Sequence, residues 1–411
     1  MLSVSDAEAI ILNLVQPLDQ QRDIEIIDLL AADHRILSTS VTSKLDFPHW
    51  DNSAMDGYAV RYEDVQHSRE AQPTSLEIIE EIPAGYQPQS TVQPGQAARI
   101  FTGAVMPTGA DTVVMQEKTR RKNNRVFILT APQPQEFVRH KGAFYQAEKQ
   151  LLPRGIKLHP PEIAVLAAAQ CAKLSVYRRP CVAIFSSGDE LVTPDQPLQP
   201  GQIVDSNQYA LAALVREAGA EPLLLGIVQD NPDALREAIA YAIAHADLVL
   251  SSGGVSVGDY DYIDQILESL GAEIHIRSVA ISPGKPLTVA TFPGSYSSIY
   301  FGLPGNPVSA LVTFWRFVQP AIKKLSGLAG GWEPVFLQVR SHHELKSNGQ
   351  RETYLWGSLQ LVDGIYEFHK AGGSHSSGNL INLAQTNALA VLPVGQTLIS
   401  PAAEVQVLQI S

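Results

Sequence analysis

Cysteine is nearly absent from this chain of 411 residues, which contains only Cys171 and Cys181. So few cysteines argue against a disulfide framework, and their spacing matches no zinc-ligand pattern, so we expect both in the core. The 11 histidines include no HExxH pairing, which argues against a histidine-bound metal. The adjacent His342 and His343 are expected to point to opposite faces of a strand.

Long apolar runs and an excess of basic residues are also missing. No stretch approaches the ~18 uninterrupted apolar residues of a membrane span, and the first residues lack the pattern of a secretion signal. We therefore expect a cytoplasmic protein without a membrane partner. The 30 Lys and Arg against 42 Asp and Glu give a net charge of −12, which argues against nucleic acid as the main partner.

The one basic cluster is the run from Lys118 to Arg125. It predicts a hairpin tip with its turn at Asn123 and Asn124, between strands at 112–116 and 126–129. We favour this solvated turn over a site for a polyanion.

The length predicts several domains. Residues 1–45 predict two helices, the first with a capping box of Ser5 and Glu8 and the second over 22–32. Residues 46–139 are rich in Pro, Gly and short β-type runs, which predicts an inserted β-rich domain. Because helical character resumes near Pro160, residues 1–45 and 140–178 are expected to form one split domain of mixed helical and β structure.

Strands and helices alternate over residues 179–327. Strands are expected at 181–185, 222–228 and 248–250, and helices follow from about 207, 233 and 263. This alternation predicts an α/β domain with a parallel-rich sheet that is covered on both faces. Residues 328–411 contain five short strand-like runs, which predict a small barrel or sandwich.

Four loops of the α/β region combine small residues with glycine, and ligands of open α/β sheets bind beyond the carboxyl ends of the strands. The loops are 186–190, 251–259, 282–286 and 302–309. Glycine lets backbone N–H groups approach a ligand, and helix starts such as the one expected at Asn306 and Pro307 favour anions. Serines, one lysine (Lys285) and this number of loops predict a large polar ligand with several anionic groups.

Acidic residues accompany the same loops. Glu190, Asp230, Asp259 and Asp261 would repel an anionic ligand unless a cation lay between them, and Mg²⁺ prefers carboxylates together with ligand phosphates. The residues alone therefore predict a nucleotide-like ligand with a metal. Each feature also has a simpler explanation as a tight turn, a helix-start acid or a solvated lysine, but their convergence favours a site. Residues 51–60 are compatible with either a turn or a site.

The motifs together resemble one family. They are DNSAMDGYAVR (51–61), RIFTGA (99–104), SGDEL (187–191), SSGGVSVGD (251–259), PGKP (283–286) and LPGNPVS (303–309). In this order they resemble the molybdopterin molybdenumtransferase (MoeA-type) family, which includes the C-terminal domain of gephyrin. The resemblance implies an elongated homodimer with an inserted β-rich domain, a molybdopterin-binding α/β domain and a C-terminal β-barrel.

The resemblance also implies a reaction. Adenylylated molybdopterin and molybdate would give molybdenum cofactor and AMP with Mg²⁺, and the substrate could be handed over by a partner from the preceding adenylylation step. The implied catalytic positions are Asp56, Thr102, Asp230, Asp261 and Lys285, and the implied metal ligands are Glu190, Asp230 and Asp261. The implied pterin–nucleotide cradle consists of Ser187, Gly188, Ser251, Gly253, Gly254, Ser256, Gly258, Pro304, Gly305, Asn306 and Ser309.

The sequence departs from the family pattern at several positions. Ala143 and Phe144 stand where Glu-Asp is usual, Ser282 and Ser278 stand where lysines are usual, and Trp356 stands where an arginine is common. Arg277, beside Ser278, is a candidate to replace one of the lost charges. These departures leave open a module that binds the cofactor without efficient metal insertion, and the gephyrin resemblance allows a scaffold role.

Overall fold

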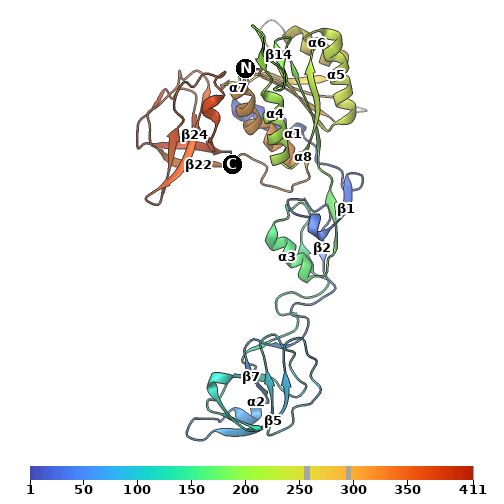
Figure 1. Ribbon diagram of the computed structural model, residues 1–411, viewed down its shortest axis with the longest axis vertical. Helices are drawn as coiled ribbons and strands as arrows, with labels where there is room; N and C mark the ends of the chain where they lie inside the picture. Colours follow the sequence, from blue (N-terminus) through green and yellow to red (C-terminus); the bar gives the residue numbers. More distant parts are fainter. Residues whose placement is uncertain (254–259, 293–297, 411) are drawn as a thin grey trace. The chain divides into compact units, whose positions relative to one another are not determined.

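The chain forms two compact units. The computed structural model describes residues 1–253, 260–292 and 298–410, and for residues 260–262 it describes the backbone alone. Unit 1 contains residues 1–39, 154–160 and 173–411, and unit 2 contains residues 40–153 and 161–172. Figure 1 shows the elements of each unit. The four-part division expected from the sequence stays a prediction.

A six-stranded sheet forms the centre of unit 1. Its strands run in the order β16 (Glu221–Val228), β13 (Cys181–Ser187), β17 (Leu248–Ser252), β21 (Ile299–Leu303), β20 (Pro286–Thr291) and β18 (Glu273–Ser278). The first four strands are parallel, whereas β20 is antiparallel to both of its neighbours, β21 and β18. The predicted α/β fold with a parallel-rich sheet is thus confirmed.

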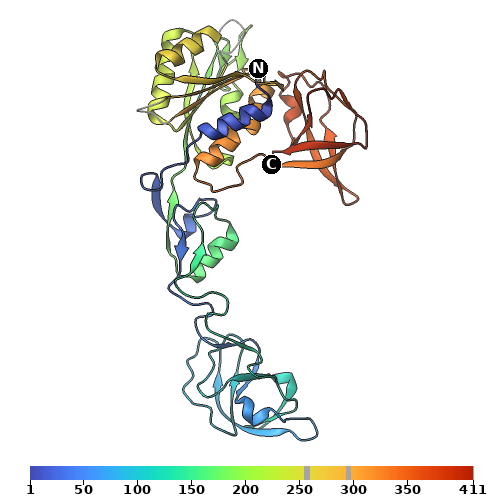
Figure 2. The same ribbon diagram turned by 180° about the vertical axis from the view of Figure 1, so that it is seen from behind.

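Helices cover both faces of this sheet (Figures 1 and 2). One apolar cluster joins the sheet to α1 (Val4–Leu14), α4 (Asn207–Glu217), α7 (Pro307–Thr313), the π-helical turn η3 (Phe314–Val318) and α8 (Gln319–Leu325). A second cluster joins it to α5 (Pro232–His245) and α6 (Tyr260–Ser269). Asn231 caps α5 by accepting a hydrogen bond from the Ala234 N–H (2.9 Å), as its Asn-Pro start predicts.

The helix α1 begins two residues earlier than the sequence predicts. Ser3, not Ser5, is the N-cap, and its hydroxyl accepts a hydrogen bond from the Asp6 N–H at 3.0 Å. Glu8 is not part of a capping box, because its carboxylate accepts two hydrogen bonds from Arg316 of η3, at 2.7 and 2.8 Å. The Arg316 side chain is 5% exposed, so this ion pair fixes α1 against η3 inside the unit.

The prediction of a second helix over residues 22–32 is wrong. These residues form strand β1 (Ile24–Asp28) and a short 3₁₀ turn, η1 (Leu29–Ala31), and β1 pairs antiparallel with β12 (Lys173–Tyr177). Residues far apart in the sequence supply the pairing partner, so tertiary hydrogen bonds outweigh the local helical pattern.

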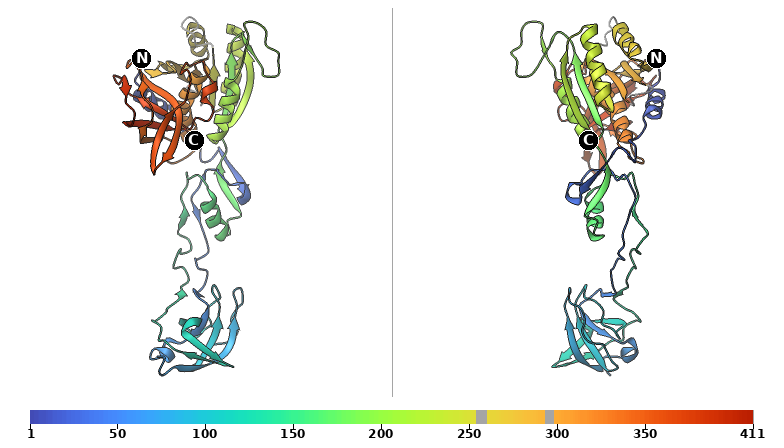
Figure 3. Two further views of the ribbon diagram at one scale, coloured as in Figure 1. Left: turned by 60° about the vertical axis from the view of Figure 1, so that its left-hand side comes forward. Right: turned by 90° about the vertical axis from the view of Figure 1, so that its right-hand side faces the viewer.

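A closed five-stranded barrel forms the C-terminal part of unit 1 (Figure 3). Its strands are β22 (Phe336–Ser341), β24 (Glu352–Val362), β25 (Ile365–Lys370), β26 (Ala388–Leu392) and β28 (Glu404–Gln409). The ring closes because β24 pairs with both β25 and β26, which makes it a barrel rather than a sandwich. The short strand β19 (Ile281–Ser282) pairs with β24 and joins the 282–286 loop to the barrel.

A second six-stranded sheet forms the centre of unit 2. Its order is β7 (Thr112–Met115), β4 (Gly57–Val60), β6 (Gln96–Ile100), β5 (Thr74–Ile82), β9 (Arg125–Ile128) and β8 (Thr119–Lys122). The turn at Asn123 is present with φ 52°, but the hairpin joins β8 to β9, because β7 pairs with β4 instead.

Short elements complete both units. They are β2 (Val41–Thr42), β3 (Asn52–Ser53), β10 (Val138–Arg139), β11 (Gln150–Leu152), β14 (Leu191–Val192), β15 (Ile203–Val204), β23 (Leu345–Lys346), β27 (Leu398–Ile399), α2 (Tyr62–Val65), α3 (Pro160–Ala168), η2 (Gln116–Lys118) and η4 (Ile381–Leu383). Within the described ranges, no helix is both long and apolar enough to cross a membrane.

We expect Glu8→Ala to lower the free energy of unfolding of unit 1 by about 3 kcal/mol, because removing one partner of a buried pair leaves the other charge unpaired. Chemical denaturation followed by circular dichroism measures this change. Glu268→Ala is the matched control, because its partner Arg277 is 54% exposed and also holds Asp264, so a loss within about 1 kcal/mol is expected. Equal losses in the two variants would contradict the prediction.

Candidate active site

A cavity of about 610 Å³ lies at the carboxyl ends of β13, β17 and β21. Its walls come from the loops that follow these strands and from the start of α4. The residues that line it are Ser186, Ser187, Gly188, Glu190, Leu191, Ile203, Val204, Asp205, Ser206, Asn207, Asp230, Ser252, Gly253, Pro286, Pro304, Gly305, Asn306, Pro307 and Ser309.

The structure brings most of the expected cradle residues of unit 1 into this cavity. Ser251 is outside it, because its buried hydroxyl is hydrogen-bonded to the Tyr300 hydroxyl at 2.5 Å. The expected residues Gly254, Ser256 and Gly258 lie outside the described residues. Asp261 lies in the first turn of α6, and its side chain is outside the described part of the chain.

Glycine at 253 allows two loops to meet in the cavity. Gly253 has φ +91°, and a Cβ atom there would lie 2.2 Å from the Ser187 carbonyl oxygen. A Cβ at Gly305 would lie 3.4 Å from the Gly253 Cα. The loops after β13, β17 and β21 therefore pack backbone to backbone, which leaves main-chain groups to face a ligand.

Asn207, at the start of α4, is a functional candidate that sequence analysis missed. Its side-chain N–H₂ donates to the Ser252 hydroxyl (2.7 Å) and to the Gly305 carbonyl (2.8 Å). Its Oδ1 atom is buried and has no hydrogen-bond partner among the described residues. Buried acceptors are normally satisfied, so this oxygen fits a donor on a bound ligand. In the sequence, the run Asp205-Ser206-Asn207 predicts only the start of the helix expected from about residue 207.

Glu190 and Asp230 flank the turn at Ser187 and Gly188. The Ser187 hydroxyl donates to Asp230 Oδ1 at 3.2 Å, and a Cβ at Gly188 would lie 2.6 Å from Glu190 Oε2. Both carboxylates therefore border the cavity. Mg²⁺ is held by one or two carboxylates plus substrate phosphates, so these residues fit a magnesium ion that is shared with a ligand.

A second cavity of about 290 Å³ adjoins the first, since both are lined by Pro286 and Ser309. It contains two cationic side chains, those of Lys285 and Arg351, and the Arg351 guanidinium donates to the Ile281 carbonyl at 3.1 Å. The remaining lining residues are Ser282, Pro283, Gly284, Thr353, Tyr354, Leu355, Trp356, His375 and Ser377. The arrangement suits a small oxyanion beside the larger cavity.

Asp56 and Thr102 are neighbours within unit 2. Asp56 Oδ1 accepts hydrogen bonds from the Thr102 N–H (2.8 Å) and hydroxyl (2.7 Å). These bonds, and the nearby charge of Arg99, lower the pKa of the partly exposed Asp56 carboxyl. Asp51, in the same motif, accepts the Lys141 N–H (2.7 Å), so the segment is a fixed turn that presents one ionised carboxylate.

Comparison with known proteins covers nearly the whole chain. Residues 2–169 match the MoeA N-terminal region (domain I and II), 183–324 a probable molybdopterin binding domain, and 338–410 the MoeA C-terminal region (domain IV). A molybdopterin molybdenumtransferase of Nostoc is 73% identical over 410 residues, covering 100% of this chain and 94% of the relative. That of Haemophilus influenzae is 37% identical, covering 90% and 88%.

The chain belongs to the molybdopterin molybdenumtransferase family. The predicted family and the predicted class of protein, an enzyme, are thereby confirmed. A molybdopterin biosynthesis MoeA protein of Pyrococcus horikoshii has the same fold, with a TM-score of 0.84, 27% identity and 100% coverage of both chains.

Two of the departures from the family pattern lie in the second cavity. Ser282 and Trp356 both line it, and Trp356 is buried with its indole N–H donating to Asn382 Oδ1 at 3.0 Å. Arg277 does not replace a lost lysine charge there, because it pairs with Asp264 (2.6 Å) and Glu268 (3.2 Å) of α6. Phe144 is 74% exposed in unit 2.

The cysteines are partly buried rather than core residues, which corrects the expectation from the sequence. Burial raises the pKa of the Cys171 thiol, and burial together with Asp247 raises that of Cys181. Because the thiolate is the form that binds metal, neither side chain is suited to receive one.

We expect Thr102→Val to raise the pKa of Asp56 toward its ordinary value, because the hydroxyl donor is lost while the backbone donor remains. A lowered pKa means that the carboxylate form is stabilised, and this stabilisation is lost as the pH falls through the folded-state pKa. Carboxyl ¹³C NMR titration of the two proteins measures the shift. An unchanged Asp56 pKa would show that the hydroxyl bond is absent in solution.

Proposed function

We propose that this enzyme transfers molybdenum from molybdate to adenylylated molybdopterin and releases AMP. One observation supports this proposal most. A cavity of about 610 Å³, with backbone-rich walls and carboxylate side chains, adjoins a smaller cavity that is lined by the cationic side chains of Lys285 and Arg351. The larger one suits a nucleotide-bearing pterin, and the smaller one suits a tetrahedral oxyanion. The 73% identical relative is a molybdopterin molybdenumtransferase, which supports the transfer of molybdenum in this proposal.

The larger cavity would hold the ligand by its phosphates. Backbone groups of the Gly253 and Gly305 loops lie on one side, and Asn207 Oδ1 offers an acceptor for a ligand N–H or O–H on the other. Glu190, Asp230 and Asp261 are our proposed ligands for Mg²⁺, which when bound neutralises charge at the phosphoanhydride that is cleaved. In this proposal the carboxylates of Glu190, Asp230 and Asp261 would orient the phosphoanhydride bond toward the second cavity.

Molybdate would bind in the second cavity. Lys285 and Arg351 supply positive charge there, and burial lowers the pKa of His375, which keeps this imidazole neutral at physiological pH. The dithiolene of the pterin, and not a protein thiol, would receive the metal, in agreement with the raised cysteine pKa values.

Asp56 and Thr102 are proposed to complete the site in a homodimer, in which the inserted region of one subunit faces the α/β region of the other. The support is chemical: Asp56 is a partly exposed carboxyl group whose pKa is lowered and which accepts two hydrogen bonds from Thr102. A protein from the preceding adenylylation step is the proposed source of the substrate.

A carrier function is the second candidate. It is favoured by Ser282 and Trp356, which line the cavity assigned to molybdate at positions where the family resemblance implies charged residues. A carrier would bind the adenylylated pterin in the larger cavity but would cleave it slowly.

An assay with adenylylated molybdopterin, Mg²⁺ and micromolar molybdate separates the two candidates. Molybdate-dependent AMP release, with reconstitution of a cofactor-free molybdoenzyme, is expected of the wild type. Asp56→Ala and Asp261→Ala should lower turnover by about 10²–10³-fold, the typical cost of a lost preorganised group, with little change in unfolding. Tight ligand binding without AMP release would instead establish the carrier, and a gain in rate for Phe144→Asp with Ser282→Lys would show that these departures reduce activity.

Gly253→Ala tests the cradle directly. We expect ligand affinity to fall by at least about 10²-fold, because the new Cβ clashes with the Ser187 carbonyl and separates the loops. Gly271→Ala is matched for backbone strain, since φ is +83° there, but no atom lies within 4 Å of its Cβ. Equilibrium binding of the adenylylated pterin, with thermal unfolding in parallel, measures both; equal affinity losses would contradict the assignment of the cavity.

A further inference from the structure

Three potential metal ligands converge on the surface of the C-terminal barrel. His342 follows β22, while Glu367 and His369 lie on β25, and their ligand atoms all lie within 4.8 Å of one another. Alternation along a strand puts Glu367 and His369 on the same face of β25, whereas Phe368 between them is fully buried in the barrel. The cluster is separate from both cavities described above.

The backbone holds the three residues in place. The His342 N–H donates to the Phe368 carbonyl at 2.9 Å, so the third residue is fixed to the strand that carries the other two. The parallel pairing of Ser341 with Phe368 continues up to this point. His342 and His343 therefore do not lie on opposite strand faces, as the sequence suggested; they follow the end of β22, with ring centroids 4.8 Å apart.

The distances suit a tetrahedral ion. Glu367 Oε2 lies 3.3 Å from His342 Nδ1 and 3.5 Å from His369 Nε2. Zinc–ligand bonds of about 2.0–2.2 Å in a tetrahedron place neighbouring ligand atoms about 3.3–3.6 Å apart. The carboxylate is therefore already at ligand spacing from both imidazoles, and rotation of the His342 side chain, which is 52% exposed, can adjust the distance between the two rings.

One ring nitrogen is left without a hydrogen bond. His369 Nε2 is buried and has no hydrogen-bond partner among the described residues, although buried polar atoms rarely stay unsatisfied. The rings of His342 and His369 stack with their centroids 4.3 Å apart, so a nitrogen of each ring lies beside the Glu367 carboxylate.

We propose that His342, Glu367 and His369 bind a zinc-type divalent cation, with water in the remaining position. Imidazole nitrogen with one carboxylate is a donor set for zinc and its first-row neighbours, whereas Mg²⁺ prefers oxygen ligands. This site is distinct from the magnesium site proposed for the cavity.

Titration of the metal-free full-length protein with Zn²⁺ tests the proposal. Excess Mg²⁺ is kept present to occupy carboxylate sites, and a chromophoric chelator reports the affinity. We expect one high-affinity zinc equivalent in the wild type. Its affinity should fall at least about tenfold in His342→Gln, Glu367→Gln and His369→Ala, because even the loss of an outer-shell partner costs roughly that much.

His245→Ala is the control, since His245 is exposed on α5 and stacks on Tyr241, away from the cluster. His342→Gln alters an exposed side chain beyond the end of β22, so this variant tests the proposal even if the variants on β25 unfold. Near-UV circular dichroism would reveal such unfolding. Unchanged affinity in His342→Gln, or an equal loss in His245→Ala, would overturn the proposal.

Discussion

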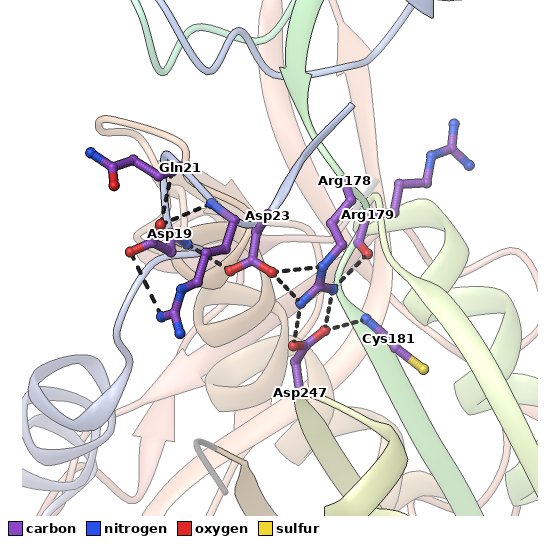
Figure 4. Close-up of polar contacts among 8 residues, drawn as sticks. Asp19, Gln21, Asp23, Arg178, Arg179, Cys181 and Asp247 are labelled. Carbon is purple, nitrogen blue, oxygen red and sulfur yellow. Dashed lines mark hydrogen bonds and ion pairs between the residues drawn. The ribbon is translucent and has the colours of Figure 1, made fainter. Parts of the chain in front are cut away.

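The arrangement of unit 1 depends on one arginine at the amino end of its parallel sheet (Figure 4). Arg178 donates to both carboxylate oxygens of Asp247, each at 2.7 Å, and to Asp23 at 2.9 Å. Asp247 also accepts the Cys181 N–H at 2.7 Å. Asp247 directly precedes β17, and Arg178 lies shortly before β13, so the bidentate pair fixes these strands against each other and the N-terminal segment against both.

The register of β13 and β17 also sets the positions of the loops at the opposite end of the sheet. Val182 pairs with Leu248 at one end and Ser186 with Ser252 at the other, so the loops that follow emerge side by side. A slip of one residue would move Gly253 away from the Ser187 carbonyl and turn each side chain of the strand to the other face. The ion pair and the glycine contact thus involve the same two strands. The Arg178–Asp247 pair fixes the alignment of the strands, and this alignment allows Gly253 to pack against the Ser187 carbonyl in the cavity wall.

Local sequence patterns predicted most helices and strands of the α/β region. They predicted few of the contacts between segments that are far apart in the sequence. Asn231 and Pro232 specify a helix start through contacts within four residues, and the glycine loops mark strand ends by themselves. Residues 22–32 were predicted wrongly because their partner, β12, lies about a hundred and fifty residues away along the chain by the pairing of Ile24 with Tyr177. The unsatisfied Oδ1 of Asn207 and the cluster around His369 could not be found for the same reason, since both depend on contacts between distant segments.

The second cavity is where departures from the family pattern bear most directly on the proposed function, although they are few in number. A lysine lost from a solvated surface would cost little, but Ser282 and Trp356 line a small cavity in which Lys285 and Arg351 supply the positive charge. Charge–charge attraction is stronger at such a partly enclosed site than in water. Because Arg277 is held by Asp264 and Glu268, Lys285 and Arg351 are the cationic side chains that the proposed oxyanion would meet in this cavity. The larger cavity has backbone-rich walls, so under the proposed function binding of the pterin and transfer of the metal would depend on different residues.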